Sequence, residues 1–235
     1  MDAMQDSKGP AGIPWAGTIA VIALMTVAGY AALFVAPTER TMGVIQRIFY
    51  FHATSGLTAF LAFFVCFMAN LLYLFKREMR WDWLGVSAAE VGVVFNTVVL
   101  VTGPIWARPV WGIWWTWDAR LTSTFVLWLL YISFLLLRTL IGEADRRAVA
   151  SAVFGIFAFL DVPLVYMSIR WWRTQHPQPV LFGGPGSGLD PQMRMVFYTC
   201  WVALAALMAL VMRQRFRVES LRHEVEELRI QLEGR

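Results

Sequence analysis

Charged residues are scarce in this chain of 235 residues, and their scarcity excludes an ordinary soluble domain. Asp, Glu, Lys and Arg make up 15% of the sequence, whereas hydrophobic residues make up 58% and the mean hydropathy is +0.57. A soluble globular protein carries roughly a quarter charged residues, which cover its surface in water. Composition alone therefore places most of this chain in a membrane.

Several motifs with defined chemistry are also missing. The chain has only two cysteines, Cys66 and Cys200, and no C-x-x-C-H motif, so it is not a c-type cytochrome that attaches haem to itself. It has no G-x-x-x-x-G-K-[ST] phosphate-binding loop, so an ATP-driven step requires a partner. The glycine-rich stretch 183–188 lacks the lysine of such a loop and is interpreted as a flexible linker.

The apolar residues fall into six blocks of the length that a membrane span requires. A helix needs about 20 residues to cross roughly 30 Å of hydrocarbon. The predicted spans cover residues 16–36, 51–75, 84–105, 121–141, 148–169 and 195–212. We therefore predict an all-α integral membrane protein with six transmembrane helices in residues 1–212. Residues 213–235 are predicted to form a separate cytoplasmic helical tail.

Positive charge is distributed unevenly between the two sides of the predicted bundle. The side with both termini holds thirteen Lys and Arg residues, and the other side holds seven. Because positive residues are retained in the cytoplasm, both termini are predicted to be cytoplasmic and the odd-numbered connections to face outward. Without the tail, the two sides carry seven each. The net charge of +4 suits anionic lipids and gives no reason to expect nucleic acid as a partner.

The connection between the third and fourth spans, residues 106–122, is unusually rich in tryptophan. Five tryptophans fall within twelve residues: Trp106, Trp111, Trp114, Trp115 and Trp117. Tryptophan favours the membrane–water interface, so an interfacial belt is one explanation. Five indole rings on one connection also suit a large, flat π-system as a ligand. If the segment is helical, the rings at 111, 114 and 115 share one face that ends at Asp118.

Two of the three histidines lie on the predicted outer side. His52 is at the outer mouth of the second span and His176 lies just beyond the fifth, whereas His223 is in the charged tail. A lone histidine near an interface is more often a hydrogen-bonded structural residue than a ligand. Two on one face, with an aromatic platform between them in sequence, favour axial ligation of a haem iron by one imidazole on each side.

Arginines on the same side offer partners for the two propionate carboxylates of haem. A planar guanidinium binds a carboxylate through two parallel hydrogen bonds. Arg120 is the first candidate because the tryptophan-rich connection itself carries it. The other candidates, for which interfacial snorkelling is the alternative role, are Arg47, Arg108, Arg170 and Arg173.

Several separate motifs resemble one known group of proteins. The run at 111–122, WGIWWTWDARLT, is similar to the WWD signature of the haem-handling proteins of cytochrome c biogenesis. More narrowly, the motifs RIFYFH at 47–52, GPIW at 103–106 and WWRTQHP at 171–177 resemble cytochrome c maturation protein C, also called haem exporter protein C. The resemblance runs from about residue 47 to residue 200, in the family's order.

This resemblance implies a protein that binds haem and passes it on, and not an enzyme. In that family, six helices bring the WWD loop and two outward histidines, here His52 and His176, together around transiently and non-covalently bound haem b. The matching loop residues are Trp111, Trp114, Trp115, Trp117 and Asp118. The implied location is the bacterial inner membrane, with the haem site on the periplasmic face. The implied partners are an ABC transporter ATPase with its membrane subunits, a small single-span membrane subunit and a periplasmic haem chaperone.

Two other functions fit parts of the pattern. A b-type cytochrome that passes electrons to quinone is expected to have histidine ligands deep within its spans, which this chain lacks. A permease for haem is expected to have internal repeats or a polar path through the spans, of which Asp161 is the main sign.

The fifth span and the tail carry further features whose roles the sequence leaves open. Pro163 is expected to kink the fifth span, and Asp161 beside it is either a buried structural group, a brace for the outer half of the span or a proton relay. The tail has apolar residues at heptad spacing: Val218, Leu221, Val225, Leu228 and Leu232. It is predicted to be an amphipathic helix on the inner leaflet or a docking helix for a cytoplasmic partner.

Overall fold

The computed structural model describes residues 15–177 and 188–233. Within them, six helical segments are long and apolar enough to cross a membrane. The helices are α1 (Trp15–Tyr30), α2 (Ile48–Lys76), α3 (Met79–Trp111), α4 (Ala119–Leu140), α5 (Ala144–Phe159), α6 (Asp161–Trp171) and α7 (Pro191–Glu233). Short π-helical and 3-10 turns, Ala31–Val35 and Val44–Arg47, extend the first two spans. The predicted six-span, all-α architecture is confirmed.

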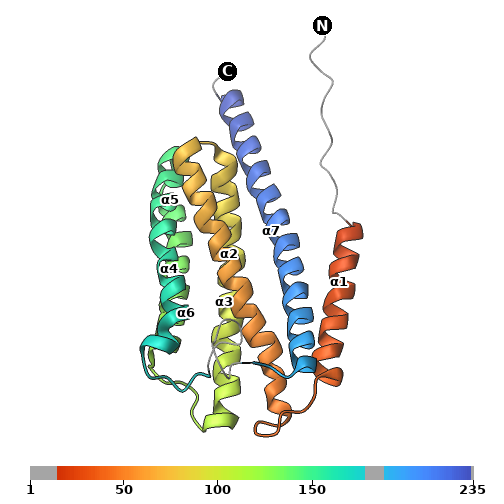
Figure 1. Cartoon of the computed structure of the whole chain (residues 1–235). Coiled ribbons are helices and arrows are strands. Elements are labelled where there is room, and N and C mark those ends of the chain that lie inside the picture. Colours follow the sequence, from red (N-terminus) through yellow and green to blue (C-terminus); the bar gives the residue numbers. More distant parts are fainter. Residues whose placement is uncertain (1–14, 178–187, 234–235) are drawn as a thin grey trace.

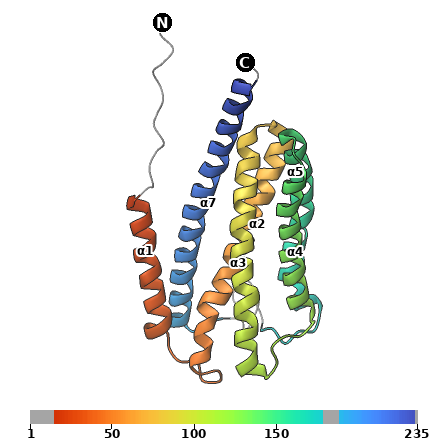
Figure 2. The same cartoon turned by 180° about the vertical axis from the view of Figure 1, so that it is seen from behind.

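Successive spans run in opposite directions, so the connections alternate between two ends of the bundle (Figure 1 and Figure 2). The start of α1, the end of α7 and the α2–α3 and α4–α5 connections lie at one end. The start of α2, the α3–α4 connection and the end of α6 lie at the other end. We call this second end the histidine end, because it brings together the elements that carry both candidate histidines and the tryptophan-rich connection.

The centre of the bundle is a close packing of α2 with α3. A Cβ on Gly92 of α3 would lie 2.4 Å from a ring carbon of Phe63 on α2, so only glycine fits this approach. Phe63 in turn stacks on Tyr131 of α4, with the ring centroids 3.7 Å apart and both side chains buried. Three helices therefore share one dense layer, which fixes the spacing of α2, α3 and α4.

The fifth span is broken into α5 and α6, as Pro163 predicts. Proline cannot donate a hydrogen bond to the carbonyl four residues earlier, and its ring crowds that carbonyl. That position is Phe159, where α5 ends. Asp161 is the first residue of α6, and its Oδ2 is buried without a hydrogen-bond partner among the described residues. α6 forms the last three turns of the span and ends at the histidine end (Figure 1).

The tryptophan-rich connection begins inside a helix, because α3 continues past the predicted end of the third span. It passes through Pro104 and Pro109 and ends at Trp111. Gly112 terminates it in the left-handed conformation, with φ 75°. Residues 112–118 are irregular. The alternative in which positions 111, 114 and 115 share one helical face is therefore wrong.

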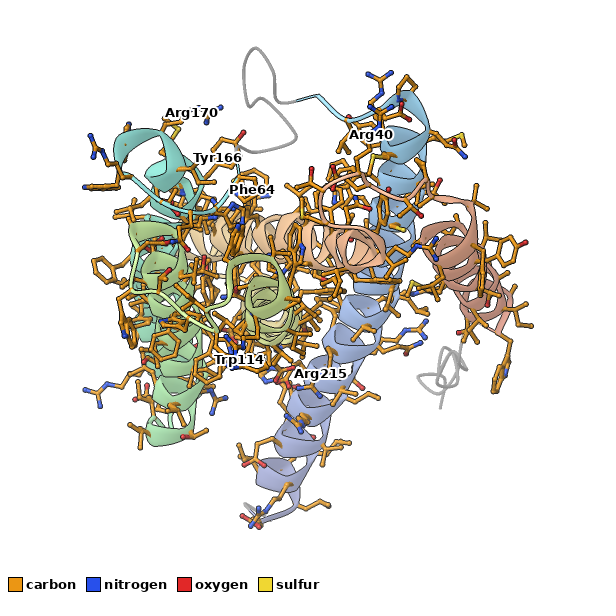
Figure 3. The ribbon with its side chains drawn as sticks, turned by 90° about the horizontal axis from the view of Figure 1, so that it is seen from below. Arg40, Phe64, Trp114, Tyr166, Arg170 and Arg215 are labelled. Atoms are coloured by element: carbon orange, nitrogen blue, oxygen red, sulfur yellow. The ribbon has the colours of Figure 1, made fainter. Side chains whose placement is uncertain are left out.

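Two ion pairs connect helices near the end of the bundle that lies opposite the histidine end. Arg138 of α4 binds Asp82 of α3 through two hydrogen bonds of 2.5 and 2.8 Å, and the two side chains are only 10% and 3% exposed. Arg215 of α7 binds Glu90 of α3, with Nη2 2.7 Å from Oε1. Figure 3 shows Arg215 on the long α7 helix, on the side that faces α3.

The predicted tail continues the sixth span without a break, since α7 runs as one helix to Glu233. The ring of His223 lies 5.3 Å from that of Trp83 on α3, so the first turns of the tail pack on the bundle. The later turns project beyond α2 and α3 (Figure 1). The heptad residues, which extend from the packed turns into the projecting ones, are 38–72% exposed. The tail's separation at residue 213 and its docking role stay predictions.

Candidate functional site

A cavity of about 470 Å³ lies at the histidine end, bordered by α2, α3, α4, α6, the start of α7 and connections between helices. This volume falls within the range of small-molecule sites. Six of the residues predicted to bind the ligand line it: His52, His176, Trp106, Trp111, Trp115 and Arg120. The cavity also extends along α2 as far as Phe60, well within the second span. Most of its lining is apolar, as a hydrophobic macrocycle requires.

His52 lies in the second turn of α2, and its ring is held by a side chain of α3. The Nδ1 atom is 2.9 Å from the Oγ1 atom of Thr102. Thr102 donates its single hydroxyl proton to the carbonyl of Val98, 2.7 Å away, so its oxygen accepts from His52. The proton of the neutral ring is therefore on Nδ1, and the Nε2 lone pair is left for a ligand.

His176 lies in the connection that follows α6. Its Nδ1 is 2.9 Å from the carbonyl oxygen of Pro177, which only accepts, so this ring also carries its proton on Nδ1. Its backbone N–H donates to the hydroxyl of Thr174 at 3.1 Å. Burial, aided by the positive charge of Arg120, lowers the pKa of His176 to about 4. The ring is therefore neutral near pH 7, with the Nε2 lone pair available.

The two histidine rings lie beside each other although they are far apart in the sequence. Their centroids are 6.5 Å apart, and the ring planes are inclined by 36°. Gly103 of α3 passes close to the His52 ring, since a Cβ there would lie 3.4 Å from its Cε1 atom. The site thus presents two neutral imidazoles, each with an unprotonated Nε2, to one cavity.

The five tryptophans divide into two groups. Trp106 is buried, and its ring meets that of His52 edge to face at a centroid distance of 5.7 Å. Trp111 lies 6.4 Å from Trp106, and Trp115 completes the part of the cavity wall that tryptophans form. Trp114 and Trp117 are 58% and 74% exposed and do not line the cavity. In Figure 3, Trp114 lies across the α2–α3 pair from Tyr166. The exposed pair suits an interface with lipid or a partner.

The indole N–H groups of Trp106 and Trp115 lie behind the surface of the cavity wall. Both Nε1 atoms are buried, and neither has a hydrogen-bond partner in the part of the chain that the structure describes. A buried donor without a partner is costly. Because neither atom is accessible from the cavity, these groups are not donors to a ligand in this arrangement.

Asp118 does not line the cavity. It caps the N-terminus of α4, where its Oδ1 accepts the backbone N–H of Leu121 at 3.0 Å. Its Oδ2 accepts hydrogen bonds from the hydroxyls of Thr116 and Thr174, at 3.2 and 2.9 Å. The carboxylate therefore joins three backbone segments.

Only one of the predicted arginines lines the cavity. Arg120, in the first turn of α4, donates to the carbonyl of Val165 on α6 at 2.5 Å and lies near both histidines. Arg108 instead donates to the carbonyl of Gly112 at the end of α3. Arg170 lies over the ring of Tyr166 on α6 (Figure 3). The remaining two, Arg47 and Arg173, lie outside the cavity lining.

Comparison with known proteins decides the family. The family model of Heme exporter protein C matches residues 8–231, nearly the whole chain. The chain belongs to the Heme exporter protein C family. Heme exporter protein C of Bradyrhizobium diazoefficiens is 30% identical over 218 residues, which cover 93% of this chain and 82% of that relative. Heme exporter protein C of Escherichia coli K12 is 31% identical over 183 residues, 77% of this chain and 73% of the relative.

A further relative carries a related name. A putative cytochrome c biosynthesis ccmC-like mitochondrial protein of Marchantia polymorpha is 29% identical over 170 residues, 72% of each chain. Membership in the Heme exporter protein C family supports a role in haem handling for cytochrome c biogenesis. The family is a haem-handling component and not a known enzyme family.

Three residues of the candidate site were not predicted from the sequence. Thr102 orients His52, Thr174 holds the backbone of His176, and Tyr166 lines the cavity from α6. The threonines give no signal in the sequence, because hydroxyls within apolar helices are common. Tyr166 gives a weak one, as a polar aromatic residue near the outer end of the fifth span.

Proposed function

We propose that this protein binds haem between His52 and His176 at the periplasmic face of the inner membrane and delivers it to a periplasmic haem chaperone. The observation that carries the proposal is the pair of Nδ1-protonated imidazoles beside one cavity. Two metal–imidazole bonds of about 2 Å would separate the ring centroids by roughly 6 Å. The separation of 6.5 Å supports this geometry.

The polar groups of the cavity suit the propionates of haem. Arg120 has guanidinium N–H groups beyond the one that donates to Val165, and an arginine fork binds carboxylates well. The apolar arm of the cavity along α2 suits the hydrocarbon edge of the macrocycle. Arg120 and this arm together favour an amphipathic, carboxylate-bearing ligand such as haem b.

The proposed function is binding and transfer. Two imidazoles fill both axial positions of the iron, which hinders reaction with oxygen while haem is held. Transfer to a chaperone requires one imidazole to leave. A partner supplies any ATP-driven motion, because the chain has no phosphate-binding loop. We infer an ABC transporter ATPase with its membrane subunits, together with a small single-span subunit, as that assembly. The surplus of Lys and Arg supports cytoplasmic termini and a periplasmic site.

Haem titration of the purified full-length protein in lipid nanodiscs tests the binding site. The wild-type protein is expected to give the absorption spectrum of six-coordinate, low-spin haem, and His52→Ala and His176→Ala are each expected to lose it. His223→Ala is the matched control, because this third histidine lies on α7, remote from the cavity. Wild-type spectra in both site variants would exclude the proposed ligands.

Delivery is tested separately by coexpression with the candidate periplasmic chaperone. The proposal predicts haem on the purified chaperone when this protein is present, and little when His176→Ala replaces it. A b-type cytochrome, the main alternative, would retain its haem in both cases. Haem that never reaches the chaperone from the wild-type protein would contradict delivery while leaving haem binding intact.

A further inference from the structure

The aspartate of the tryptophan-rich connection uses both of its oxygens within the protein. The Oδ1 atom of Asp118 caps α4, and Oδ2 accepts the hydroxyls of Thr116 and Thr174 at 3.2 and 2.9 Å. A carboxylate offers about four lone-pair positions, and three of these are occupied here. Asp118 also lies outside the cavity lining. Its contacts therefore point away from haem and toward the segment that carries His176.

Thr174 connects Asp118 to the backbone of His176. Its hydroxyl donates to Asp118 and accepts the backbone N–H of His176 at 3.1 Å. Two consecutive hydrogen bonds thus connect the start of α4 to the backbone of a candidate iron ligand. The first of them is to a charged group, which makes it the stronger of the two.

The two histidines are held in very different ways. His52 belongs to α2, and its ring is fixed by Thr102 of α3, so two packed helices determine its position. His176 lies beyond the end of α6, in an irregular connection. The hydrogen bonds of Asp118 and Thr174 join the backbone of this connection to the start of α4.

We propose that Asp118 and Thr174 are positioning residues for His176, and that His176 is the ligand that leaves when haem is passed on. This inference rests on the proposed function. The carboxylate also holds the connection at Thr116, next to Trp115 and Trp117. A partner that displaces the tryptophans therefore weakens the hold on His176 through the same oxygen, whereas His52 stays in its helix.

The test compares Thr174→Val with Thr174→Ser in full-length, haem-loaded protein in nanodiscs. Valine keeps the shape but removes the hydroxyl, so the six-coordinate, low-spin spectrum is expected to give way to a five-coordinate one. Haem transfer to apomyoglobin is expected to be at least about tenfold faster, the effect of losing one charge-assisted hydrogen bond. Added imidazole is expected to restore the low-spin spectrum while the haem still co-elutes with the nanodiscs, whereas haem released from an unfolded protein would not co-elute. Serine keeps the hydroxyl and is expected to behave as wild type.

If the valine variant fails to fold, Asp118→Asn tests the same positioning role from the other end of the hydrogen bond. Asparagine caps a helix as well as aspartate does, so α4 is preserved while the charged acceptor is lost. The expected changes are those of Thr174→Val. Wild-type spectra and transfer rates in both variants, with ligation still lost in His176→Ala, would overturn this inference and leave the proposed function standing. A wild-type protein without a low-spin spectrum would overturn the proposed function itself.

Discussion

Replacing Thr102 with valine is expected to weaken haem binding by about 10- to 100-fold, although Thr102 does not line the cavity. Its hydroxyl accepts the Nδ1 proton of His52 at 2.9 Å while donating its own proton to Val98. Valine keeps the volume but leaves a buried N–H without its acceptor, at a cost of about 1–3 kcal/mol. Without the acceptor, the ring of His52 is free to rotate or to move its proton to Nε2. A proton on Nε2 would occupy the position that the iron needs.

The assay is a haem titration of full-length variants in nanodiscs, followed by absorbance. Thr102→Ser keeps the hydroxyl and is expected to retain wild-type affinity. Thr97→Val is the matched control, because Thr97 on the same helix donates to Val93 and accepts from the indole of Trp128, both at 2.8 Å, away from the cavity. It is expected to leave the Kd unchanged. An unchanged Kd in Thr102→Val, or an equal loss in Thr97→Val, would refute the reasoning.

Three further predictions concern pH and packing. Because burial holds the pKa of His176 near 4, its ring stays neutral as the pH falls from 7 to 5. A pH titration of the haem-loaded protein is therefore expected to lose the low-spin spectrum only toward pH 4. Loss of that spectrum above pH 6 would contradict this expectation. Gly92→Ala places a Cβ 2.4 Å from the Phe63 ring, so thermal unfolding is expected to show a loss of about 1–3 kcal/mol in the free energy of unfolding. Gly29→Ala, whose Cβ would have nothing within 4 Å, is expected to leave that free energy unchanged. Asp82→Asn leaves the guanidinium of Arg138 buried without its opposite charge. Denaturant titration is therefore expected to show that the free energy of unfolding falls by about 3–5 kcal/mol. A decrease below about 1 kcal/mol would contradict this expectation.

The number and order of the spans were predictable, because hydrocarbon demands an unbroken apolar run of fixed length. The break before α6 was also predictable, since Pro163 crowds the carbonyl of Phe159. The end of α3 was not. Pro109 lies in the predicted connection and would ordinarily end a helix, yet α3 continues through it to Trp111. No local sequence rule predicts a helix that runs through a proline in its last turn.

The site was predictable where residue types are rare and chemically distinctive. His52, His176 and Arg120 line one cavity as expected, and so do three of the five tryptophans. The irregular backbone after Gly112 turns Trp114 and Trp117 outward, which no periodicity rule anticipates.

The residues that orient the histidines were not predictable. Thr102 bonds the carbonyl four residues earlier, as many threonines in apolar helices do. Only the approach of α2 to α3 makes it an acceptor for His52. Thr174 likewise acquires its role from the meeting of two connections that are distant in sequence. Contacts of this kind depend on the assembled bundle and leave no local pattern.

Electron paramagnetic resonance of the ferric, haem-loaded protein in nanodiscs tests the central claim most directly. Ligation by His52 and His176 predicts a low-spin signal in the wild-type protein and a high-spin signal in each single alanine variant. His223→Ala is expected to keep the low-spin signal. A high-spin signal from the wild-type protein, or a low-spin signal that survives both His52→Ala and His176→Ala, would contradict the account.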